Sequence, residues 1–222
     1  MNQALLRLRS LVAGILLCGG ALGHAGSYDD FFRAIKQDNA GVISALLQRG
    51  FDPNTLNPAG EHGLILAVRD ESLKVVAVLL NGPKINVEAR TLQDESALML
   101  ASLQGLTELC GQLIDKGADV NKPGWAPLHY AATNGHLAVM RLLLEHDAYI
   151  DAESPNGTTP LMMAAQYGTQ AAVLLLLEAG ADPSLKNQQG LSAIHFAQRT
   201  GRTEAVELIA SFIRKLQPKA AW

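Results

Sequence analysis

Apolar residues recur at helical spacing along most of the chain, and the pattern itself repeats. An alanine closes each short apolar run and recurs at intervals of 33, 34, 30, 33 and 33 residues. These positions are Ala34, Ala67, Ala101, Ala131, Ala164 and Ala197. A second apolar position follows twelve residues later, at Leu46, Leu79, Leu113, Leu143, Leu176 and Ile209. The spacing predicts a pair of helices in each repeat, the second burying this position.

Glycines mark the ends of the predicted helices. Four of them lie four residues past the recurring alanine, namely Gly105, Gly135, Gly168 and Gly201. A glycine there can adopt the left-handed conformation that ends a helix. After the second helix, a glycine followed two residues later by aspartate recurs in segments 50–54, 117–121 and 180–184. Each segment is expected to end the helix and begin an extended turn.

A recurring motif begins each predicted first helix. The clearest copies are Ala126-Pro-Leu-His-Tyr-Ala131, Thr159-Pro-Leu-Met-Met-Ala164 and Ser192-Ala-Ile-His-Phe-Ala197, and Gly135-His136 follows the first of them. These residues closely resemble the ankyrin repeat, whose signature runs threonine-proline-leucine-histidine, then glycine-histidine, then glycine-alanine-aspartate. The resemblance covers roughly residues 27–215. It implies an all-α ankyrin-repeat solenoid of stacked helix pairs, with β-turn fingers that project at right angles.

Two departures from the repeat concern the fingers and the helix starts. The finger before the fourth unit, residues 122–125, has lost three residues, and the finger before the third, residues 86–96, is predicted to be enlarged by two. Such variation marks either a binding surface or neutral drift of a turn. The hydroxyl–histidine pair that tightens the signature in this family is retained only by Ser192 and His195. The motif histidines are predicted to be structural.

The first 25 residues have the layout of a cleavable signal peptide. Arg7 and Arg9 precede a short apolar run, and Gly23-His-Ala25 supplies small residues at the cleavage site. A transmembrane anchor or a buried helix is disfavoured because an anchor needs about 20 apolar residues. A lipoprotein signal at Cys18 is a third, weaker alternative.

The rest of the chain is predicted to be one ankyrin-repeat domain. It spans residues 26–215 in about six units including the caps, and residues 216–222 form a frayed tail. Ser27, followed by an acid, resembles the start of the first helix. Removal of the signal leaves Cys110 as the one thiol. It is interpreted as a small buried apolar residue, with a reactive or intermolecular thiol as the alternative.

Charge and motifs exclude several classes of function. The net charge is −3 with no basic block, which disfavours nucleic acid as a partner. The sequence has no phosphate-binding glycine loop, nucleophile elbow or metal-binding helix motif, so we predict no catalysis, cofactor or small-molecule substrate. The polar cluster His146, Asp147, Asp151 and Glu153 is interpreted as a solvated turn rather than a cation site. Asn156 is a glycosylation acceptor only in a eukaryotic secretory pathway.

The resemblance also implies where a partner would bind. In that family, partners dock in the groove formed by the finger tips and the exposed edges of the first helices. Trp125, Tyr167 and Leu191 stand out because aromatic and apolar residues dominate binding hot spots. The alternative for Trp125 is that it packs on Pro123 over the shortened finger. The full set of predicted partner-binding residues is Trp125, Tyr167, Leu191, Leu103, Arg199, Arg69, Glu95, Asn134, Gln166 and Thr158.

The predicted function is a non-enzymatic protein-interaction module outside the cytoplasm. The chain is expected to be a monomer, without a membrane span, in the periplasm if the source is bacterial or secreted otherwise. What similar proteins are thought to do suggests protection of a stress enzyme such as a catalase. The alternative is a secreted effector that binds host proteins.

Overall fold

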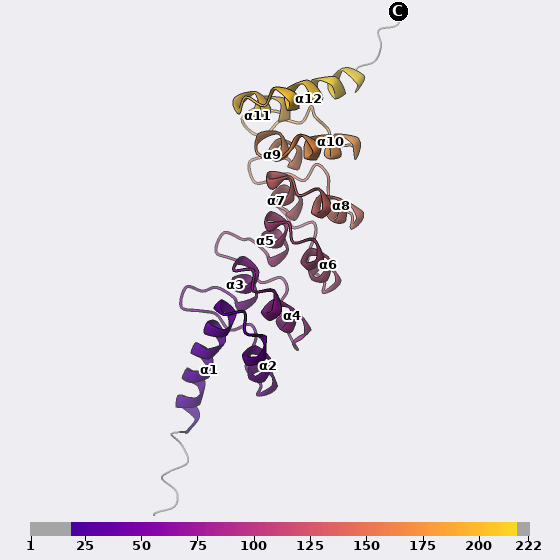
Figure 1. Ribbon diagram of the computed structural model, residues 1–222. Helices are drawn as coiled ribbons and strands as arrows, with labels where there is room; N and C mark the ends of the chain where they lie inside the picture. The colour runs from indigo at the N-terminus through magenta and orange to yellow at the C-terminus, as the bar shows by residue number, and fades with distance from the viewer. Residues whose placement is uncertain (1–18, 217–222) are drawn as a thin grey trace, which may run out of the picture.

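The predicted stack of helix pairs is confirmed. The computed structural model describes residues 19–216, and Figure 1 shows the pairs stacked in sequence order into an elongated solenoid. Odd-numbered helices form one row and even-numbered helices a second row beside it. The helices in this range are α1 (Gly19–Lys36), α2 (Ala40–Gln48), α3 (Gly63–Arg69), α4 (Leu73–Asn81), α5 (Ala97–Gln104), α6 (Thr107–Asp115), α7 (Pro127–Asn134), α8 (Leu137–Glu145), α9 (Pro160–Gln166), α10 (Gln170–Glu178), α11 (Ala193–Arg199) and α12 (Thr203–Leu216).

The core lies between the two rows of helices and consists of the two recurring columns. The alanine column is buried, at most 2% exposed, and so are the apolar residues of the second helices, at most 1% exposed. An alanine at this position lets neighbouring first helices pack closely, as α5, α7, α9 and α11 do. Both columns join one continuous apolar cluster along the solenoid. Each pair therefore buries its apolar face both between its own two helices and against the neighbouring pairs.

The turn between paired helices is left-handed in most units, but not always at a glycine. Gly105, Gly135 and Gly201 have φ of +75°, +68° and +68°, as predicted. Gly168 does not adopt the left-handed conformation. A Cβ built on it would lie 2.3 Å from the Ala132 carbonyl oxygen, so the glycine is required there by close packing.

The starts of the first helices are capped in three chemically different ways. Ser192 and His195 form the hydroxyl–imidazole pair that was predicted, at 2.9 Å. At Met162, which replaces a histidine, the Sδ atom accepts the backbone N–H of Thr159 at 3.4 Å. At His129, Nδ1 accepts the backbone N–H of Ala126 at 3.1 Å. The structural interpretation of these histidines agrees with these contacts.

The fingers correct the predicted loop lengths. The segment 86–96 is not enlarged, because its tip has the same five-residue hydrogen-bonded turn as three other fingers. The closing N–H···O bonds run from Asn57 to Glu61, Thr91 to Glu95, Ser154 to Thr158 and Asn187 to Leu191. The extra residue of the 34-residue interval lies instead in the turn after α4, where Lys84 has φ +61°. Residues 122–125 form the shortened turn that was predicted, without such a tip.

Hydrogen bonds to side chains connect each finger to the next. At one recurring position the side chain accepts a backbone N–H from the following unit, and this aligns successive fingers. The acceptor–donor pairs are Asn54–Asn86, Glu88–Asp119, Asn121–Tyr149 and Asp151–Asp182. Asp151, which the sequence analysis placed in a polar cluster, is thus part of this series of hydrogen bonds between fingers. Burial raises the pKa of its carboxyl group.

The N-terminal helix begins earlier than predicted. Ser27 lies inside α1, which starts at Gly19, so the expected helix start at Ser27 is wrong for the chain described. Residues 1–18 of the predicted signal and residues 217–222 of the predicted tail lie outside the described residues. Over residues 19–216, no helix combines the length and the apolar character that crossing a membrane requires.

Candidate protein-binding groove

The residues predicted to line a partner-binding groove come from the odd-numbered helices, their ends and the turns before them. Figure 1 shows the turns before α3 and α5 projecting outward from this row. The structure places the predicted residues in three groups. Tyr167, Arg199, Arg69 and Asn134 are exposed, Trp125, Glu95, Leu191, Leu103 and Gln166 are half-buried, and Thr158 is buried.

Tyr167 is the most exposed aromatic residue of the predicted set. It caps the C-terminal end of α9, where its backbone N–H donates to Met163 at 2.9 Å. Its side chain is nevertheless 57% exposed. Because its backbone is fixed and a tyrosine side chain has few rotatable angles, Tyr167 would lose little conformational entropy on binding, which suits a contact residue.

Trp125 precedes α7 in the shortened finger. Its ring lies edge-to-face against His129, with the centroids 5.2 Å apart and the planes at 74°. His129 is held in turn by Ala126 and by the Thr158 carbonyl oxygen, 2.9 Å from Nε2. The ring of Trp125 is therefore anchored on one side, and part of it remains exposed.

Two polar contacts join α7 and the shortened finger to the preceding finger. Tyr130 of α7 donates its hydroxyl to Oε1 of Glu95 at 3.0 Å, across the boundary between two units. Burial, followed by the charge of Glu95, raises the pKa of the Tyr130 hydroxyl. Lys122, whose side chain is only 8% exposed, pairs with Asp94 at the tip of the preceding finger. The hydrogen bond from Lys122 lowers the pKa of the Asp94 carboxyl.

Other predicted residues are engaged in contacts within the chain. Arg69 pairs with Glu61 at 2.6 Å, and hydrogen bonds from Asn57 and Arg69 lower the pKa of the Glu61 carboxyl. The Asn134 amide donates to the Leu103 carbonyl oxygen at 2.8 Å, which links two successive first helices. A partner would have to compete with these contacts for the polar side chains of Arg69 and Asn134.

Thr158 is a correction to the predicted set. Its side chain is 2% exposed, so it cannot present a contact to a partner. The reason is the closed tip of residues 154–158, in which the Thr158 N–H donates to Ser154 Oγ at 3.0 Å. The Thr158 carbonyl oxygen meanwhile faces the ring of His129. The position serves packing between units.

Sequence reasoning missed Leu92, which is 83% exposed at the tip of a finger. The equivalent positions of the other tips hold Pro58, Pro155 and Gln188, so an apolar side chain stands out there. The tips align only once their closing hydrogen bonds are known, so the structure was needed to find it. Tyr149, 67% exposed, was also missed.

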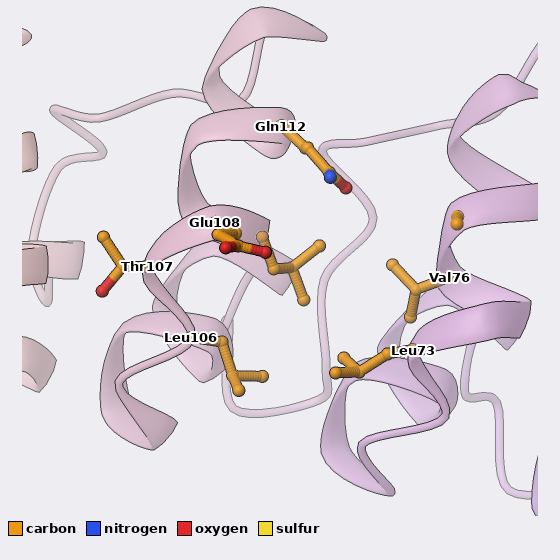
Figure 2. A pocket seen from close by; sticks show the side chains of 8 residues that line it. Leu73, Val76, Leu106, Thr107, Glu108 and Gln112 are labelled. Atoms are coloured by element: carbon orange, nitrogen blue, oxygen red, sulfur yellow. The ribbon is translucent and has the colours of Figure 1, made fainter.

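A recess lies among the even-numbered helices, away from the predicted partner-binding residues. Figure 2 shows side chains of α4 and α6 facing each other across it, with Leu73 and Val76 on one side and Leu106 on the other. Its volume is about 350 Å³. The lining is mainly apolar, and Leu73 is 44% exposed. The sequence did not predict this recess.

Cys110 is a free thiol within the described residues. Cys110 is fully buried beside Ser102, and burial raises the pKa of its thiol to about 11. The interpretation of Cys110 as a small buried residue is thus confirmed, since a thiolate is strongly disfavoured. Within residues 19–216, no three His, Cys, Asp or Glu side chains are grouped as a metal site would require.

Comparison with known families identifies the repeat. A family model described as ankyrin repeats (3 copies) matches residues 31–123, 64–154 and 98–187, which overlap to cover more than half of the chain. A mouse protein, the B-cell lymphoma 3 protein homolog, is 30% identical over 53% of this chain and 28% of its own length. A putative ankyrin repeat-containing protein of Treponema pallidum is 30% identical over 60% of this chain and 46% of its own length. The matches span less than half of either relative.

Solved structures share the fold over most of the chain. A chain from the complex of a predatory endopeptidase with an immunity protein of Bdellovibrio bacteriovorus has a TM-score of 0.71 and 26% identity. The match covers 82% of this chain and 97% of that one. The human ASB11 ankyrin repeat domain has a TM-score of 0.74 and 25% identity, with 82% of each chain covered.

Proposed function

Because this chain belongs to the ankyrin-repeat family, we propose that it is a non-enzymatic module that binds a protein partner in the groove of finger tips and first helices. One observation carries the proposal. Leu92 and Tyr167 are exposed and Trp125 is half-buried, and these three apolar or aromatic side chains come from successive units, in the turns before or the ends of the odd-numbered helices. Stacked repeats use such an extended surface for binding, since each unit adds one finger and one helix edge.

The location proposed is outside the cytoplasm. Arg7, Arg9 and the small residues that end at Ala25 support a cleavable signal. The protein would then be located in the periplasm if the source is a bacterium, and would be secreted otherwise. N-terminal sequencing of the mature protein should then begin at or near Gly26. Recovery of soluble protein that still carries Met1 would overturn export.

The partner proposed is an enzyme that the module protects or restrains, such as a catalase, and the module acts as a monomer. The similar chain from Bdellovibrio bacteriovorus supports an enzyme partner, because it comes from a complex of an endopeptidase and an immunity protein. The alternative is a secreted effector that binds host proteins.

A pull-down tests these proposals. Tagged mature protein is incubated with the native cell envelope fraction and with host extract, and bound proteins are identified by mass spectrometry. A single enzyme retained from the envelope and lost with the Tyr167→Ala variant supports the first proposal. Retention from host extract alone favours the effector. The absence of any specific protein in both fractions contradicts the proposed function.

A further inference from the structure

The acid Glu95 occupies an unusual electrostatic position in the groove. Its two carboxylate oxygens accept hydrogen bonds from neutral hydroxyl groups, Tyr130 at 3.0 Å and Thr91 at 3.2 Å. In the described part of the chain no Lys, Arg or His nitrogen pairs with it. The neighbouring acid, Asp94, is already paired with Lys122. One half-buried negative charge is therefore left without a counter-charge.

The packing of α5 against α7 sets Trp125 of the next unit in the neighbourhood of this charge, and Leu92 belongs to the same finger as Glu95. Glu95 and Trp125 hold equivalent positions, two residues before the first residues of α5 and α7, and these two helices pack against each other. Packed helices lie about 8–10 Å apart, so one long side chain can reach both residues. The contact between Tyr130 and Glu95 confirms that the first turn of α7 lies at the carboxylate. Leu92, three residues before Glu95, is exposed at the tip of the same finger.

The shortened finger keeps Trp125 accessible. The other fingers place a closed five-residue tip directly before the first helix, and the turn of residues 122–125 has no such tip. The side chain of Lys122 folds back to Asp94 instead, where it is only 8% exposed. The result is a half-exposed indole one unit on from a carboxylate that has no counter-charge among the described residues.

We propose that Glu95, Trp125, Tyr130 and Leu92 form a binding site for an arginine side chain of the partner protein. This inference rests on the proposed function and names the chemistry of the partner at one contact. A guanidinium group can donate two parallel hydrogen bonds to the Glu95 carboxylate. Its plane can stack on the indole of Trp125, and Leu92 can cover its aliphatic stem.

Arginine fits this site better than lysine. A lysine ammonium is a compact, strongly hydrated charge, and it cannot both bridge a carboxylate in two places and stack on a ring. An arginine presents a planar fork that is only weakly hydrated. A site with one fixed carboxylate beside an aromatic ring selects for that geometry.

A fluorescence titration tests the site directly. Trp222→Phe leaves Trp125 as the one tryptophan, and this full-length protein is titrated with a neutral-ended pentapeptide whose central residue is arginine. Saturable change of the Trp125 emission is expected at millimolar peptide or below, and the same peptide with citrulline at the centre should bind about tenfold more weakly or not at all. A lysine peptide should be weaker than the arginine peptide.

Variants separate a binding site from a merely structural contact. Glu95→Gln keeps the hydrogen-bond acceptor for Tyr130 but removes the charge, and should weaken the arginine peptide about tenfold while leaving the melting temperature unchanged. Glu145→Gln, an exposed acid of α8 in the same unit as Trp125, is the matched control and should change nothing.

Two results would overturn the site. One is the absence of a saturable response to the arginine peptide, and the other is equal binding of the arginine and citrulline peptides. A partner that is retained in the pull-down with full affinity for the Glu95→Gln variant would leave the proposed function standing and defeat this inference alone. Peptide binding without any retained partner would support the arginine site and contradict the proposed function.

Discussion

The imidazole of His129 and the backbone carbonyl oxygen of Thr158 lie 2.9 Å apart, which joins the start of α7 to the tip of the next finger. Because Nδ1 of the same ring accepts the Ala126 N–H, the neutral tautomer with its proton on Nε2 satisfies both contacts. The ring is 1% exposed and also supports Trp125. One buried histidine thus fixes two successive fingers relative to each other.

This histidine should make the fold sensitive to mild acid. Burial lowers the pKa of His129 below its ordinary value of 6.5, so the unfolded chain binds the proton more readily than the folded chain. The contribution of His129 to the free energy of unfolding is therefore fully present above pH 6.5. It declines as the pH falls below that value, by at most about 1.4 kcal/mol per pH unit. Urea unfolding between pH 7.5 and 5 measures the slope. His129→Gln should flatten it, whereas replacement of the exposed His146 by Gln should not; equal slopes in all three proteins would contradict the assignment.

The buried second-helix column should dominate stability. Leu143 is fully buried between helix pairs, so Leu143→Ala removes apolar contacts and leaves a cavity. We expect a loss of about 2–5 kcal/mol in the free energy of unfolding by urea. Leu92→Ala, at an 83% exposed position, is the control and should cost less than about 0.5 kcal/mol. A loss below about 1 kcal/mol at Leu143 would mean that the repeat register is wrong.

Gly168 should tolerate no side chain, for a packing reason rather than a conformational one. The Cβ of Gly168→Ala would lie 2.3 Å from the Ala132 carbonyl oxygen and 2.9 Å from the Ala164 Cα. Backbone would have to move, and we expect destabilisation of about 1–3 kcal/mol by thermal or urea unfolding.

The matched control for Gly168 is Gly111, inside α6, where a Cβ would meet nothing within 4 Å. Gly111→Ala should stabilise the protein by up to about 1 kcal/mol, because alanine has the higher helix propensity. Destabilisation at both positions, or at neither, would argue against the close contact of α7 and α9 at Gly168.

The groove residues should affect binding more than stability. Trp125→Ala and Tyr167→Ala should each weaken the affinity for the retained partner by at least about 1–2 kcal/mol, as truncated hot spots do. Calorimetric titration measures the affinity, and His146→Ala, on an exposed turn outside the groove, should leave it unchanged. If Trp125 instead serves the core, its variant will be destabilised and will bind with full affinity. A stable Trp125→Ala variant with full affinity would contradict both interpretations.

The sequence by itself determined the architecture of this protein. Both buried columns, the helix pairs and the Ser192–His195 pair follow from local spacing, because a helix buries one face and each repeat has the same neighbours. The candidate groove of finger tips and first helices came instead from the resemblance to the ankyrin family, and Tyr167, which was predicted to lie in it, is exposed.

The tertiary structure decided which side chains are free to bind. Thr158 looked like its counterparts in other units, and only the closed tip and the ring of His129 bury it. Gly168 and Gly105 occupy the same position of the repeat, yet Gly168 is required by close packing and Gly105 by a left-handed backbone. Glu95 gained its hydroxyl donor from a residue 35 positions away. Contacts between successive repeats depend on three-dimensional stacking, and periodicity along a single chain does not specify them.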